Sequence, residues 1–181
     1  MNLKDKLRQA LLEAKRVYDY NNVAVILKVD SDEWKEFQSK ISDEDISAYE
    51  TGAGREMNPH ITVLYGIHTD VPDKDVEDLI ETIKEPLIEF GSITSFTNDD
   101  FDVLKFDIES SDLVKLNKLF KKLPHTCQFP NYHPHCTIAY LKKGTAKKYI
   151  KEFSGVKLTN PEIKNFIYSK SDGTKKNYNL Q

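Results

Sequence analysis

Two short segments of this chain share a pattern of residues that can carry out acid–base chemistry. HITV occupies residues 60–63 and HCTI residues 135–138, so each has a histidine, an apolar residue, a threonine and a second apolar residue. An imidazole titrates near neutral pH and can accept or donate a proton, and a threonine hydroxyl can donate a hydrogen bond to an anion. The repeated pattern predicts a site in which one histidine is a base and the other an acid.

Both segments favour β-strands, and the strand period fixes which side chains share a face. Residues two apart on a strand point the same way, so His60 and Thr62 share one face, as do His135 and Thr137. The apolar residues of each tetrapeptide take the opposite face and anchor the strand. A lone strand histidine is more often structural, but two copies are expected by chance in roughly one chain in a thousand of this composition. The matched pair therefore indicates catalysis.

Composition sets limits on the class of protein and on its partners. The 181 residues, with 39% hydrophobic and 30% charged, predict one domain spanning residues 1–181 with an ordinary core. A net charge of −3 argues against long duplex nucleic acid, which selects basic surfaces, and leaves a small anionic ligand open. Two cysteines without zinc-like spacing, no signal peptide and no membrane-length apolar run predict a cytoplasmic protein that binds no membrane.

The periodicity of the apolar residues predicts the order of the elements. Helices are expected over 2–19, 32–41 and 73–89, after Ser110 or Ser111, and after Thr145, and strands over 22–29, 60–66, 92–98, 101–108 and 135–141, with a hairpin around SDGT near the C-terminus. This order predicts an α+β fold built on antiparallel sheet, and a helix after each histidine segment suggests two similar lobes. The polar segment 42–59 is long for a connector and is expected to be a mobile flap beside the site.

The two segments, their spacing and the element order resemble the 2H phosphoesterases, whose signature is one H-apolar-T/S-apolar motif in each half of the chain. The resemblance implies two pseudo-symmetric lobes with a groove between them, lined by His60 and Thr62 on one wall and by His135 and Thr137 on the other. It also implies phosphodiester cleavage without a metal or other cofactor. No cluster of carboxylates or cysteines accompanies the histidines in the sequence to suggest metal ligands.

The phrases PHITVLYG and HCTIAYLKKG resemble most closely a branch of phage enzymes that linearise the cyclic oligonucleotide signals of bacterial immunity. In that branch an acidic and an aromatic residue at similar offsets contact a base, which makes Glu162 and Tyr168 candidates. Six positions apart on one strand, they are expected to share a face. Arg55, in the proposed flap, is a candidate for contacting phosphate. A phage-encoded protein would act in the cytoplasm of its host.

Three functions stay open at this point. The first is hydrolysis of a small cyclic or linear oligonucleotide, and the second is a 2′,3′-cyclic phosphodiesterase acting on RNA ends or small nucleotides. The third belongs to another class, a nucleotide-binding sponge without turnover, which would not need two proton carriers. The expected partner is a small nucleotide or oligonucleotide, and the expected assembly a monomer or a small homo-oligomer.

Overall fold

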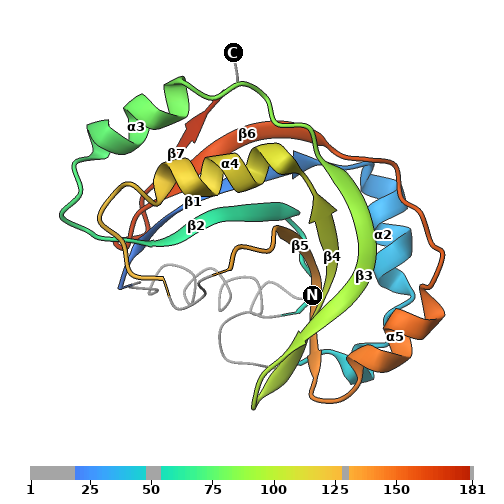
Figure 1. Cartoon of the computed structure of the whole chain (residues 1–181). Coiled ribbons are helices and arrows are strands. Elements are labelled where there is room, and N and C mark those ends of the chain that lie inside the picture. The colour runs from blue at the N-terminus through green and yellow to red at the C-terminus, as the bar shows by residue number, and fades with distance from the viewer. Residues whose placement is uncertain (1–18, 48–53, 128–130, 180–181) are drawn as a thin grey trace, which may run out of the picture.

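A computed structural model describes residues 19–47, 54–127 and 131–179, and the helix predicted over 2–19 lies outside them apart from its last residue. The chain forms two separate sheets (Figure 1). The first has the order β2 (His60–Ile67), β1 (Asn21–Lys28), β6 (Glu162–Ser169) and β7 (Lys175–Tyr178). The second has the order β3 (Glu89–Thr97), β4 (Phe101–Glu109) and β5 (His135–Lys142). Every strand pair is antiparallel, which confirms the predicted α+β class.

Four α-helices flank the sheets in the described part of the chain, and their bounds are α2 (Ser31–Ser39), α3 (Asp73–Glu81), α4 (Ser111–Phe120) and α5 (Ala146–Glu152). A short 3₁₀ turn, η1 (Asp43–Asp45), follows α2. In Figure 1, α3 and α4 lie beside the first sheet, and α2 and α5 lie outside the second. None of these helices is long and apolar enough to cross a membrane.

In each sheet, the helix that follows an inner strand packs on the other sheet. α2 follows β1 of the first sheet, yet its Trp34 stacks on Phe90 with ring centroids 6.4 Å apart, and its Phe37 lies 5.6 Å from Phe106 of the second. Conversely, α4 follows β4 of the second sheet and packs against β2 of the first. Because the apolar faces of α2 and α4 are each buried against the other sheet, both sheets share one continuous core and cannot separate without exposing it.

Two predicted boundaries are wrong, and a residue remote in sequence bonds the start of one helix. The helix expected over 73–89 ends at Glu81, and β3 begins at Glu89 rather than at residue 92. Thr145 precedes α5 as predicted, but its side chain caps nothing. Asp102 of β4 accepts instead from the N–H of Ala146 at 3.0 Å.

Gly66, near the end of β2, is required by the approach of another segment. Its φ is 104°, and a Cβ there would lie 1.9 Å from the carbonyl oxygen of Thr126. The N–H of Thr126 donates to the Gly66 carbonyl at 2.9 Å, so the segment that leads toward β5 is bonded directly to β2.

Gly66→Ala is expected to destabilise the protein by more than about 3 kcal/mol, because it adds a backbone clash to the strain of a positive φ. Gly144→Ala is the matched control, since Gly144 has a φ of 85° and no atom lies within 4 Å of the place that a Cβ would take there. The control should lose only about 1 kcal/mol. Chemical denaturation measures both, and equal losses would contradict the role given to the Thr126 contact.

Candidate active site

The two motif segments begin β2 and β5, which are the edge strands of the two sheets. Ile61 and Cys136 are fully buried, whereas His60, Thr62 and His135 are partly exposed. Thr137 is 8% exposed. The alternation predicted for each tetrapeptide is therefore present, and each strand turns its imidazole away from the core.

β2 and β5 are in direct contact, which brings the two motifs together. Burial raises the pKa of the Cys136 thiol, and the backbone N–H of His60, which hydrogen-bonds the sulfur, opposes that rise. Tyr132, just before β5, donates its phenol O–H to the carbonyl of Thr62 at 2.9 Å. Neither sheet holds both histidines, so the site exists only where these edge strands meet.

A β-bulge follows the threonine of each motif. Val63 is the extra residue of β2 opposite Val23 and Ala24, and Ile138 is the extra residue of β5 opposite Leu104 and Lys105. A bulge leaves its residue out of the ladder and bends the strand. The fourth, apolar residue of HITV and of HCTI is therefore the point at which each motif strand turns.

A buried side-chain amide satisfies the carbonyl of each bulge. Asn117 of α4 donates to the Val63 carbonyl at 2.7 Å, and Gln38 of α2 donates to the Ile138 carbonyl at 2.9 Å. Asn117 lies on the helix that follows β4 of the second sheet, and Gln38 lies on the helix that follows β1 of the first. The sequence prediction missed both residues, because an isolated Asn or Gln in an amphipathic helix gives no signal of a remote backbone partner.

The surroundings of His135 favour its neutral form. Burial lowers its pKa most, and the charges of Lys105 and His60 lower it further, against opposing effects from the His133 carbonyl and from Asp107. Its Nδ1 lies 2.9 Å from the His133 carbonyl oxygen. Because a carbonyl only accepts, Nδ1 carries the proton and Nε2 of the neutral ring is free to accept one.

His60 has an acidic neighbour, Glu56, whereas His135 has the cation of Lys105 near it. Nδ1 of His60 lies 2.9 Å from the Asn58 carbonyl, so it too donates, and 3.8 Å from Oε2 of Glu56, an ion pair that exists while the ring is protonated. The carboxylate of Glu56 also accepts from the N–H of Asn58 at 2.8 Å, which fixes its position. Both of these contacts of His60 use Nδ1, and neither uses Nε2.

Arg55 does not point toward either motif. Its Nε donates to the Gln38 carbonyl at 3.2 Å, another guanidinium nitrogen donates to the Ile41 carbonyl, and Nη1 pairs with Asp43 at 2.7 Å. The guanidinium is thus occupied at the C-terminal end of α2. Its expected contact with phosphate would require these bonds to be exchanged.

The expectation that Glu162 and Tyr168 share a face is wrong, because Lys164 forms a bulge in β6 opposite Ile26 and Leu27. Tyr168 is fully buried on the side of α3, and its hydroxyl bonds Asn21 at 2.8 Å. Glu162 lies opposite Lys28 on the motif face and forms an exposed ion pair with it at 2.7 Å. The structure thus leaves Glu162 accessible and removes Tyr168 from the motif face.

The described ends of the proposed flap are bonded to β5. Ser47 N–H donates to the Tyr140 carbonyl at 3.0 Å, and Glu56 N–H donates to the Ile138 carbonyl at 2.9 Å. Residues 48–53 lie outside the described part of the chain. Residues 54–56 are therefore bonded to β5 through a single bridge between Arg55 and Ala139, and Pro59 already accepts from the N–H of Leu27 in β1.

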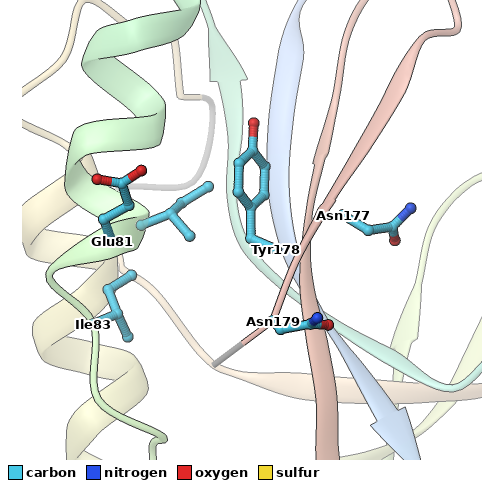
Figure 2. A pocket seen from close by; sticks show the side chains of 6 residues that line it. Glu81, Ile83, Asn177, Tyr178 and Asn179 are labelled. Carbon is cyan, nitrogen blue, oxygen red and sulfur yellow. The ribbon is translucent and has the colours of Figure 1, made fainter. Parts of the chain in front are cut away.

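Two surface cavities lie away from the motifs. One, of about 280 Å³, lies between α3 and β7 and is lined by Glu81, Ile83 and Tyr178 among others (Figure 2). The other, of about 570 Å³, lies between β3 and the segment after α5. Neither includes a motif histidine. In the ranges that the structure describes, no three His, Cys, Asp or Glu side chains gather as a metal site would require.

Comparisons with known proteins agree with this architecture. A sequence model of the 2′-5′ RNA ligase superfamily matches residues 32–164, more than half of the chain and both motifs included. The chain therefore belongs to the 2′-5′ RNA ligase superfamily, which places it among the 2H phosphoesterases. A comparison with curated proteins found no match.

Solved structures share the fold at low sequence identity. Usb1 of Kluyveromyces marxianus is 7% identical with a TM-score of 0.57, covering 91% of this chain and 99% of its own. The structure of K. marxianus Usb1 with uridine monophosphate is 8% identical with a TM-score of 0.55, covering 90% of this chain and 98% of its own. E. coli LigT complexed with 3′-AMP is 11% identical with a TM-score of 0.52, covering 90% of this chain and 96% of its own. At such identities the likeness is one of fold.

Asn117→Leu is expected to cost about 1–3 kcal/mol, because the Val63 carbonyl loses its buried amide donor. Gln38→Met should cost less at its bulge, because the Ile138 carbonyl keeps the N–H of Glu56. Lys118→Leu, on the exposed side of α4, is the control and should change stability little. Urea denaturation measures all three. If Asn117→Leu were as stable as the control, the amide would not support the bulge.

Proposed function

We propose that the protein is a phosphodiesterase that uses His60 and His135 as acid and base on a small cyclic or linear oligonucleotide, without a metal. The observation that supports this most strongly is the contact between β2 and β5, because it joins the two motif strands and leaves His60 close enough to act electrostatically on His135. Membership of the 2H phosphoesterases is the second support.

The different surroundings of the two rings assign the roles. His135, whose pKa is lowered, is the base, and its Nε2 removes a proton from water or from a ribose 2′-hydroxyl. The oxygen so activated attacks phosphorus while the bond to the leaving oxygen breaks. His60, paired with Glu56 when charged, gives its Nε2 proton to that leaving oxygen. Each turnover leaves His135 protonated and His60 neutral, and exchange with solvent restores them.

The threonines suit the stabilisation of the transition state. Thr62 and Thr137 share the faces of their histidines and have hydroxyls that can donate to the non-bridging oxygens. Such donors act most strongly where water is scarce, as it is at Thr137, which is 8% exposed.

Within this chemistry we propose a cyclic oligonucleotide of bacterial immunity as the substrate, with the reaction taking place in the cytoplasm. The two motif phrases and the mild negative charge support a compact ligand over a long nucleic acid. Glu162, on the motif face, is the remaining candidate for contacting a base. Structures of Usb1 with uridine monophosphate and of LigT with 3′-AMP are consistent with a small nucleotide-bearing substrate.

Incubation with cyclic di- and trinucleotides, 2′,3′-cyclic nucleotides and 2′,5′-oligoadenylate in EDTA tests the substrate. Linearisation of the cyclic oligonucleotides, followed by chromatography, is the expected result. Turnover of 2′,3′-cyclic nucleotides alone would instead assign a terminal cyclic phosphodiesterase. Binding without cleavage of any compound would contradict the enzymatic proposal and favour a sponge.

His60→Ala and His135→Ala are each expected to lower kcat by at least about 10²-fold on whichever substrate is cleaved, because each removes one proton carrier. His125→Ala is the control, since the His125 ring bonds only the nearby Leu123 carbonyl in the described structure and is not part of a motif. Circular dichroism checks that each variant folds. Wild-type kcat in either motif variant would refute the assigned role.

A further inference from the structure

An ion pair with a buried cation lies beside the second motif, on the same face of the sheet. In the antiparallel register of β4 and β5, Lys105 lies opposite Thr137 and Asp107 lies opposite His135. Register partners project to the same side of a sheet. The pair therefore belongs to the surface that carries the histidine, although neither residue belongs to a motif.

The contacts of Lys105 fix its ammonium in place. Its Nζ forms an ion pair with Asp107, donates to the Thr94 hydroxyl at 2.6 Å, and lies 4.3 Å from the centre of the Phe96 ring. The side chain of Lys105 is 5% exposed, whereas that of Asp107 is 42% exposed. Thr94 also donates to Asp107 at 3.0 Å. The cation is thus buried and held by groups from two strands.

Stability alone does not account for this pair. Removing a lysine from water carries a large desolvation penalty, and a well-packed apolar pair of similar volume is often as stable. The ring that covers Lys105 also contacts the motif, because Phe96 meets His135 edge to face with centroids 4.9 Å apart. The buried charge therefore lies within electrostatic reach of the imidazole.

We propose that Lys105 and Asp107 are positioning residues that set the protonation state of His135. Lys105 disfavours the imidazolium by repulsion and Asp107 favours it by attraction, so the balance between them keeps the ring able to accept a proton. The catalytic consequence rests on the proposed function, but the electrostatic effect does not. The other charged group that acts on His135 is His60 of β2, which has Glu56 beside it.

The two partners should act in opposite directions when each is neutralised. Lys105→Met removes the repelling cation and leaves Asp107 uncompensated, so the titration midpoint of His135 should rise by about one pH unit. Asp107→Asn leaves the cation, so the midpoint should fall. The double variant removes both charges and should return close to the wild-type midpoint, and Lys105→Arg should stay near it. A merely structural role would not give shifts of opposite sign.

NMR titration of the His135 ring in the ligand-free protein measures these shifts. A His60→Gln background removes the coupled titration of the other imidazole. Lys148→Met is the matched control, because Lys148 pairs with Asp45 at 3.0 Å and lies 4.9 Å from the Tyr149 ring centre, outside the motif face. It should leave the midpoint unchanged. Asp107→Asn gives an independent test should Lys105→Met fail to fold, since Asp107 is partly exposed.

Shifts of the same sign, or no shift in Asp107→Asn, would overturn the proposal. In variants that retain turnover and the His60 side chain, the acidic limb of kcat/KM should move in the same direction as the NMR midpoint. Opposite NMR shifts in a protein that cleaves no phosphodiester would uphold the ion-pair inference and reject the proposed function. The two failures are therefore distinguishable.

Discussion

The contact between β2 and β5 is the constraint on which the site depends. Each strand is the edge of its own sheet, and each sheet carries one imidazole. The thiol of Cys136 against the backbone N–H of His60 marks the meeting point. The packing of α2 on the second sheet and of α4 on the first maintains this contact between the strands. Sliding one sheet past the other would expose the aromatic packing around Trp34 and the face of β2 beneath α4. The relative position of the two motif strands is thus maintained by apolar packing away from the histidines.

A bulge gives the fourth residue of each motif a structural position of its own. A strand needs only the histidine and the threonine to present an imidazole and a hydroxyl on one face. The fourth residue, Val63 or Ile138, leaves the ladder and its carbonyl accepts an amide hydrogen bond from α4 or α2, respectively. Each motif is therefore hydrogen-bonded to a helix that packs on its own sheet but follows a strand of the other sheet. The apolar side chain at that position is buried and cannot move toward solvent.

The sequence alone predicted correctly those features that a local period determines, namely which motif side chains share a face and where most of the helices lie. Alternation placed His60 with Thr62 and His135 with Thr137, and helical spacing found most of the helices in the described chain. Prediction failed where one residue altered the period or where a partner was remote. The extra Lys164 reversed the faces assigned to Glu162 and Tyr168, and nothing local indicates a bulge. Remote partners likewise determined the bonding of Arg55 and the capping of α5.

The two halves carry the same motif but differ in the charged residues around it. Acid–base catalysis requires inequivalent groups, since two imidazoles in identical surroundings would hold their protons equally. The fold separates them through residues outside the motifs. Glu56 enters beside His60 from the segment that is also bonded to β5, whereas Lys105 lies next to His135 on the adjacent strand. An apolar strand such as VLKFDI, residues 103–108, that carries two opposite charges at alternate positions indicates a charged face within a core sheet. In the proposed mechanism, repetition of the motif therefore supplies the pair of proton carriers, and charged residues outside the motifs give the two rings different surroundings.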